Sequence, residues 1–261
     1  MRLALYTALG FVVFAIALAV FAPAALLTRF IPEGSPLQVK HPSGMLWRGK
    51  GALEFDSQSV AMVRWRIAPR HWLDGRLGID YELGPGSFEL EGELTTGGEG
   101  TLLTATGQIS EHWINQRLGA YDISVQGELS LEAVQLWVGP LNDMPPQMQL
   151  EGNCHWSGGA TEFALSGTSF LTSLPAMAIE LTTENERFEA TVGLESHPER
   201  ELFRVSLEHP TGWVHVGVTG HFLDLINWPR FDSLDPSRVL IEVSERLYDP
   251  VQTMPSETGS S

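Results

Sequence analysis

Residues 76–94 read RLGIDYELGPGSFELEGEL, and this stretch decides the fold class. On either side of the Gly-Pro-Gly turn at residues 84–86, every second residue is apolar or glycine. Glu89, Glu91 and Glu93 occupy the intervening positions of the second half. Because successive side chains of a strand point to opposite faces, the pattern predicts an antiparallel hairpin with one apolar face and one polar face.

The same alternation recurs along most of the chain. We expect strands at residues 43–55, 60–69, 76–83, 88–94, 102–109, 121–138, 148–156, 161–170, 176–182, 187–194, 201–207 and 213–222. Residues 110–119 instead have helical spacing, and residues 237–248 fit either a strand or a helix. A mid-strand glycine between apolar neighbours recurs, as in Leu90-Gly92-Leu94, and favours a bent sheet. The expected fold class is therefore mainly β, with one large curved antiparallel sheet and one or two short helices.

The N-terminus differs from the rest because residues 3–28 contain no charged side chain. About 20 apolar residues suffice for a helix to span a bilayer. We therefore expect a single N-terminal transmembrane helix within residues 1–29, followed by a linker at 30–42, a periplasmic β-rich domain at 43–248 and a disordered tail at 249–261. The residues assigned to the membrane anchor are Leu3, Phe11, Phe14, Leu18, Phe21 and Leu27. A signal peptide cleaved near residues 22–24 and a buried core helix stay open as alternatives.

Composition excludes several classes of function. The net charge of −16 argues against nucleic acid as a partner, since phosphates require a basic surface. It also argues against adsorption to anionic lipid through a basic patch. The single cysteine, Cys154, cannot form an internal disulfide, and we interpret it as a small buried hydrophobe.

No catalytic motif stands out in the sequence. There is no Gly-x-Ser-x-Gly elbow, no phosphate-binding glycine loop and no His-Glu-x-x-His pair. The three glutamates at 89, 91 and 93 are interpreted as a solvated strand face rather than a calcium site, and the scattered histidines as surface or core residues. We therefore expect no enzyme activity, no cofactor and no metal.

Several short segments, in this order, resemble the type II secretion system protein N family of Gram-negative bacteria. The segment at residues 44–49, GMLWRG, is similar to the family's G-T-L-W-x-G, and residues 63–69 and 73–77 are similar to its W-R-L-x-P and L-x-G-R-L run. Residues 127–131 and 150–156 resemble two later G-x-L segments. The positions singled out as an interaction or structural motif are Gly44, Trp47, Gly49, Trp65, Arg66, Pro69 and Gly75.

The resemblance implies a single-pass inner-membrane protein with its bulk in the periplasm. It would be an accessory part of the machine that exports folded proteins, in contact with other secretion subunits, and it brings no catalytic residues. Strand addition at an exposed sheet edge would be one mode of contact, with a long unpaired edge and no deep pocket expected. The alternative is a periplasmic lipid-binding or lipid-transfer protein, which would carry a continuous apolar groove. A hydrolase with a polar cleft is the third hypothesis.

Overall fold

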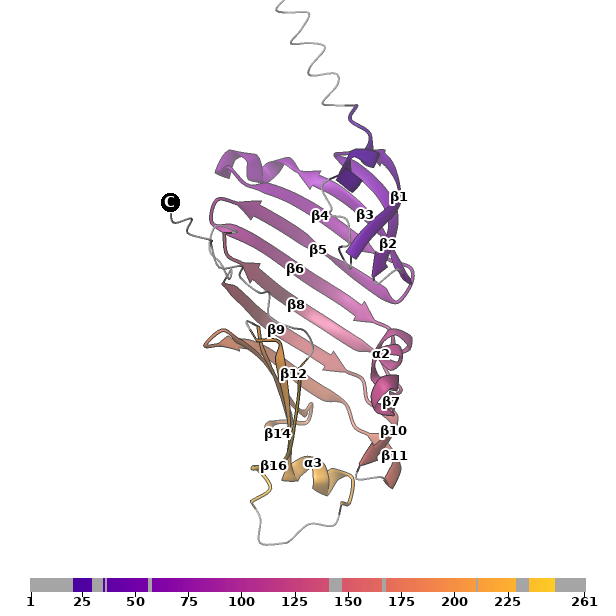
Figure 1. The fold of residues 1–261 in the computed structure, drawn as a ribbon, viewed down its shortest axis with the longest axis vertical. Coiled ribbons are helices and arrows are strands. Elements are labelled where there is room, and N and C mark those ends of the chain that lie inside the picture. The colour runs from indigo at the N-terminus through magenta and orange to yellow at the C-terminus, as the bar shows by residue number, and fades with distance from the viewer. Residues whose placement is uncertain are drawn as a thin grey trace, which may run out of the picture.

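A computed structural model describes residues 21–29, 35, 37–55, 58–140, 147–165, 168–209, 211–228 and 235–246. These residues form a 13-stranded antiparallel sheet in the order β1-β2-β3-β4-β5-β6-β8-β9-β12-β13-β14-β15-β16. A separate three-stranded sheet has the order β11-β10-β7. Each strand of the large sheet follows its neighbour along the chain, apart from the departures to the small sheet (Figure 1).

The strands of the large sheet are β1 (Leu37–Met45), β2 (Arg48–Phe55), β3 (Gln58–Ala68), β4 (Leu77–Leu83), β5 (Phe88–Gly97), β6 (Gly100–Ile109), β8 (Leu129–Val138), β9 (Met148–Trp156), β12 (Met177–Glu184), β13 (Arg187–Leu194), β14 (His197–Glu208), β15 (Trp213–Thr219) and β16 (Val239–Arg246). The small sheet contains β7 (Ser124–Val125), β10 (Gly159–Leu165) and β11 (Thr168–Leu174). The helical elements are η1 (Ala24–Arg29), η2 (Pro69–Asp74), α2 (Glu111–Leu118), η3 (Gly119–Tyr121) and α3 (Gly220–Leu225).

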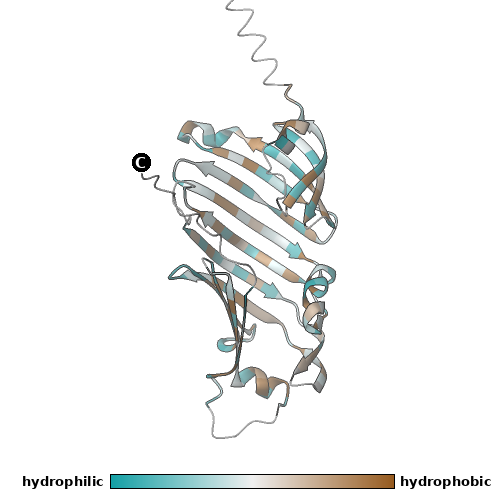
Figure 2. Ribbon diagram, viewed as in Figure 1, coloured by the Kyte–Doolittle hydropathy of each residue, from teal (hydrophilic) through white to brown (hydrophobic). Residues whose placement is uncertain are grey.

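The strand register gives the large sheet two distinct faces. One row of directly paired residues, from β2 to β16, is apolar or glycine throughout: Gly51, Val63, Leu83, Leu90, Gly107, Leu131, Cys154, Ile179, Val192, Phe203, Val218 and Ile241. An adjacent row begins Lys50, Arg64, Glu82 and Glu91 and lies on the other face. Figure 2 shows the resulting alternation of hydrophilic and hydrophobic bands along the strands.

The apolar face is covered over only part of its length. Near the C-terminal end, the small sheet and α3 pack on it and form a core that includes Trp156, Phe163, Met177, Leu202 and Phe222. In β4, β5 and β6, by contrast, Gly78 is the only buried residue. In Figure 1 the strands β4–β9 are seen face-on while β12–β16 are seen edge-on, so the sheet bends toward its covered end.

The mainly β fold, the large antiparallel sheet and the short helix after residue 110 are confirmed. Residues 213–222, predicted as one strand, instead end in α3. Gly220 approaches Pro236 so closely that a Cβ would lie 2.7 Å from the Pro236 Cα, and Phe222 turns into the core. Residues 30–42, predicted as a linker, instead contain the start of β1. A strand can include Pro42 here because β1 is an edge strand and its pairing is irregular between Lys40 and Ser43.

The predicted anchor falls mostly outside the described residues, including Leu3, Phe11, Phe14 and Leu18. Its last part does not continue as an α-helix: Pro23 forms a bridge with Met45, and residues 24–29 form the 3₁₀ helix η1, which contains Leu27. Ala24 is buried against the domain, whereas Phe21 is exposed. Within the described ranges, none of the helices has the length and apolarity to cross a bilayer.

Candidate interaction surfaces

Three of the motif residues meet where the β1–β2 turn lies against β3. Gly44 lies near the end of β1 opposite Gly49, and its φ of +96° favours glycine there. The Trp65 indole Nε1 donates to the Leu46 carbonyl oxygen at 3.0 Å. Gly49 is the cross-strand partner of Trp65, and a Cβ there would overlap the indole ring. Because Trp65 is only 8% exposed, this part of the motif holds the fold together rather than presenting a contact surface.

Three more motif residues begin, end or pack against the 3₁₀ helix η2. Pro69 begins it, and Gly75 ends it in the left-handed conformation with its N–H donating to the Trp72 carbonyl at 3.1 Å. Trp47 packs edge-to-face with Trp72, with ring centroids 6.4 Å apart. These contacts fix η2 against the sheet while the Leu73 side chain remains exposed.

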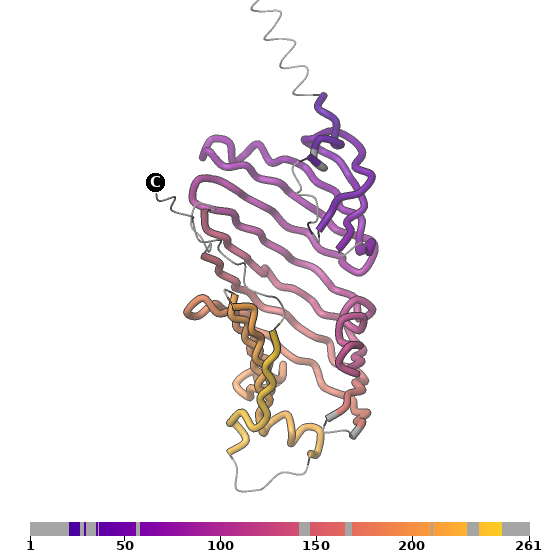
Figure 3. The backbone as a smooth tube through the Cα atoms, in the orientation of Figure 1, coloured from indigo at the N-terminus to yellow at the C-terminus, as the bar shows by residue number. Residues whose placement is uncertain are grey.

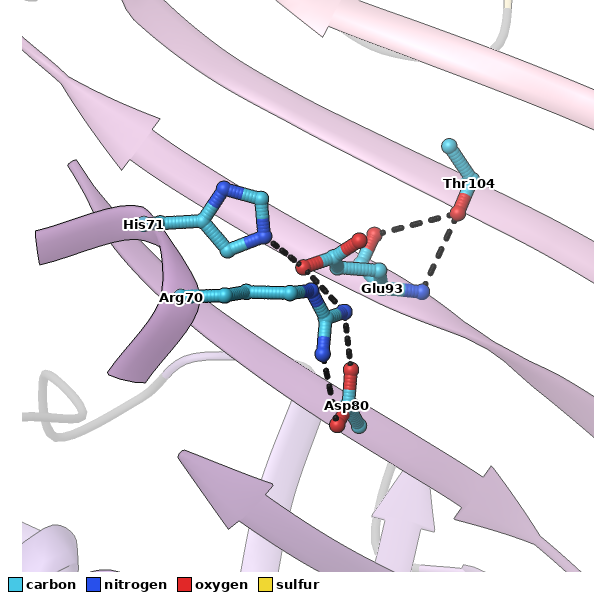
Figure 4. Close-up of polar contacts among 5 residues, drawn as sticks. All are labelled: Arg70, His71, Asp80, Glu93 and Thr104. Carbon is cyan, nitrogen blue, oxygen red and sulfur yellow. Dashed lines mark hydrogen bonds and ion pairs between the residues drawn. The ribbon is translucent and has the colours of Figure 1, made fainter. Parts of the chain in front are cut away.

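A charged network ties η2 to the polar face of β4 and β5 (Figure 4). Arg70 donates to both carboxylate oxygens of Asp80, at 2.6 and 3.4 Å, and to Glu93 Oε1 at 2.8 Å. His71 Nε2 lies 2.5 Å from the same Glu93 oxygen, and the Glu93 backbone N–H donates to Thr104 Oγ1 at 3.0 Å. Hydrogen bonds to Asp80 and then to Glu93 raise the pKa of Arg70 above its ordinary value. Two carboxylates of this face are therefore already occupied by Arg70.

Arg66, the remaining motif residue, lies in a basic cluster that consists of Arg48, Lys50, Arg64 and Arg66. Strand pairing sets Arg48 directly opposite Arg66 and Lys50 directly opposite Arg64. The cluster lines an open hollow of about 650 Å³ on the polar face, together with Asp80, Glu82 and Glu91. Among the described residues, only Arg64 of these four has an ion pair, with Glu82 at 2.6 Å. Strand pairing also sets Glu82 opposite Arg64 and Asp80 opposite Arg66, so these carboxylates offset part of the repulsion between the basic side chains.

The two edge strands of the large sheet differ. At β1 the pairing shifts between Lys40 and Ser43, His41 has a φ of 49°, and Pro42 lacks an N–H. Bulges and prolines of this kind obstruct the addition of another strand. Among the described strands, β16 pairs only with β15; it contains no proline, and its Val243 side chain is 57% exposed. The open edge of β16 is therefore the better site for strand addition.

An apolar cavity of about 420 Å³ lies between the large sheet and its covering layer, which consists of the small sheet and α3. Among the described residues that line it, polar atoms come from Thr161 and from the indole Nε1 of Trp156. Ile179 and Val218 line it from the large sheet, while Phe163 and Phe222 line it from β10 and α3. The structure thus has the unpaired edge expected of an assembly component, but it also has a pocket, against the expectation of none.

Cys154 lies on the apolar face beside Ile179, its partner on β12. Burial, followed by the charge of Glu132, raises the pKa of the Cys154 thiol to about 11. The thiol is therefore neutral at ordinary pH and unsuited to nucleophilic attack. The described residues also contain no group of three or more His, Cys, Asp or Glu side chains that could hold a metal ion.

Comparison with known families identifies the chain by its sequence. It matches the family described as type II secretion system (T2SS), protein N, over residues 35–213. The chain belongs to this family. The match supports its assignment as a component of the type II secretion system and agrees with the motif resemblance in the sequence. The corresponding comparisons with curated proteins and with solved structures gave no match.

Sequence reasoning missed the basic cluster and the cavity. Arg64 and Arg66 alternate visibly within their strand, but only the register with β2 places Arg48 and Lys50 opposite them. A search for like charges on consecutive strands could have suggested the cluster. The cavity had no local signal, because the sequence of β10 does not reveal that this strand leaves the large sheet.

Proposed function

We propose that this protein is an accessory component of the type II secretion machinery and that it acts through protein contacts of its β domain. The residues that precede Ala22 would hold it at the inner membrane, with the domain in the periplasm. The absence of charged side chains from residues 3–21 supports the membrane assignment, and the length of the domain that follows supports the orientation. The family supports contacts with other secretion subunits.

The open edge of β16 is the observation that carries the contact proposal. Val243 pairs with Val216 on β15, and Ile241 pairs with Val218, so an added strand would extend the apolar face by one further row. Its backbone would gain hydrogen bonds from the free edge, while its side chains would cover the exposed Val243. The partner is therefore an extended segment of a secretion subunit with apolar residues at alternate positions.

The experiment places a charge at each edge in turn. Val243→Lys on β16 and Leu37→Lys on β1 are a matched pair, because the two side chains are 57% and 48% exposed. Each variant replaces the natural protein in cells, and export of a type II substrate is measured. We expect Val243→Lys to reduce export to the level of cells that lack the protein, since lysine on an edge opposes strand addition.

Leu37→Lys is expected to leave export unchanged. Equal amounts of both variants in the membrane fraction control for folding and turnover. Full export with Val243→Lys, at normal protein levels, contradicts the contact proposal. Equal loss of export with both variants also contradicts it, because the effect would then not belong to the β16 edge.

A further inference from the structure

We propose that the cavity between the large sheet and its covering layer binds one acyl chain of a membrane lipid. This proposal adds a ligand site to the protein and relies on the proposed function for one point, the position of the domain next to a membrane. The cavity volume of about 420 Å³ lies in the range of small-molecule sites, which is roughly 300–1,000 Å³.

The lining selects the chemistry of the ligand. No charged side chain occurs among the described residues that line the cavity; its polar groups are Thr161, which is only 4% exposed, and the buried indole Nε1 of Trp156. A peptide in this space would leave its backbone N–H and C=O groups without partners, which disfavours it. A hydrocarbon chain has no such groups and gains from contact with Phe163, Phe203 and Phe222.

The shape of the apolar surface points to an elongated ligand. The row that contributes Ile179 and Val192 to the cavity continues along the sheet through Cys154, Leu131 and Gly107, and it reaches Val63 on β3. Strands lie about 4.8 Å apart, so the five spacings from β9 to β3 cover about 24 Å. An acyl chain extends over half of the ~30 Å hydrocarbon core, about 15 Å. One chain therefore fits with its end in the cavity and its remainder on the uncovered row.

Photo-crosslinking of the full-length protein in phosphatidylcholine liposomes tests this site. A fraction of the lipid carries a diazirine near the end of one acyl chain. After irradiation, the adducts are located by digestion and mass spectrometry. We expect adducts on peptides that contain residues 161–179 and 216–222. Adducts found only on residues 1–29, or nowhere, overturn the proposal, and this result requires no variant.

A matched pair of variants separates the cavity from general contact with lipid. Ile179 lines the cavity, whereas its neighbour Ala178 faces the other side of the same strand and pairs with His155 and Gly193. We expect Ile179→Trp to fill the cavity and lower adducts there at least several-fold. Ala178→Trp should leave them unchanged. Cavity adducts that persist in a folded Ile179→Trp protein, judged by its far-UV spectrum, overturn the proposal.

The same preparations distinguish this proposal from the proposed function. Val243→Lys lies at the β16 edge and is expected to keep its cavity adducts even where export fails. Loss of export in Val243→Lys with a wild-type adduct map supports two separate sites. If no cavity adducts form and Val243→Lys still blocks export, the acyl-chain proposal is wrong and the contact proposal stands.

Discussion

The two halves of the large sheet share one pattern of alternation but have different surroundings. From β9 to β15 the apolar face is covered by the small sheet and α3, and Leu202 there is only 1% exposed. From β4 to β6 the same face carries Ile79, Leu94 and Leu103, which remain half-buried. In Figure 3 the described strands of both halves lie side by side in one sheet, in the order that the strand pairing gives. Alternation therefore determines which side of a strand is apolar, but separate chain segments determine whether that side becomes a core.

Paired truncations of leucine test this contrast most strongly. Leu202→Ala removes a fully buried side chain, and we expect it to lower the free energy of unfolding by about 3 to 5 kcal/mol. Leu103→Ala in the uncovered half should cost about 1 kcal/mol, because less of that side chain leaves water on folding. Urea unfolding of both variants provides the measurement. Equal costs would show that the β4–β6 face is covered in solution.

The reactivity of the Cys154 thiol tests the difference in burial at β9, where the covered part of the apolar face begins. Its pKa of about 11, against an ordinary 9.0, reduces the thiolate fraction below pH 9 by about 100-fold. We expect alkylation of Cys154 to keep accelerating as the pH rises from 9 toward 11. A thiol introduced by Leu103→Cys in a Cys154→Ser background should react faster and level off at lower pH. Rates that match for the two thiols would contradict the difference in burial.

The contact of Trp65 with the β1–β2 turn should make a smaller contribution to stability, confined to the N-terminal region. Trp65→Phe removes the hydrogen bond to the Leu46 carbonyl, and we expect a loss of about 1 kcal/mol in the free energy of unfolding. Trp137→Phe is a control, since Trp137 is a half-buried tryptophan on β8. Thermal unfolding measures both. If Trp65→Phe lowers the free energy of unfolding no more than the control does, the hydrogen bond from Trp65 to Leu46 does not stabilise the fold.

The polar face should show the smallest effect. Hydrogen bonds from the Thr211 hydroxyl and then from Arg187 lower the pKa of Glu208 from its ordinary 4.5. The sign follows from linkage: this contribution is fully present above the unfolded pKa and is lost as the pH falls through the folded one. We expect Glu208→Gln to weaken the dependence of the unfolding midpoint on pH below 4.5. Glu199→Gln on the exposed part of β14 should preserve it, and identical profiles for the two variants would contradict the assignment.

The sequence predicted the positions of the strands better than it predicted which part of their apolar face is covered. Alternation in residues 76–94 correctly gives β4 and β5 and their two faces, because that signal is local. The short motifs indicated the family, although Trp65 and Gly49 turned out to pack against each other. Coverage could not be predicted, since β10 alternates like its neighbours yet pairs with β7 and β11. The basic cluster and the cavity depend in the same way on strand register, which no single segment encodes.

Photo-crosslinking from the β16 edge tests whether this edge contacts a secretion subunit. The photoreactive amino acid benzoylphenylalanine replaces Val243 in one full-length protein and Leu37 of β1 in another, and both are irradiated in living cells. We expect a crosslink to a type II secretion subunit from position 243 and none from position 37. A crosslink from position 37 alone, or none from either position in cells that export normally, would contradict it.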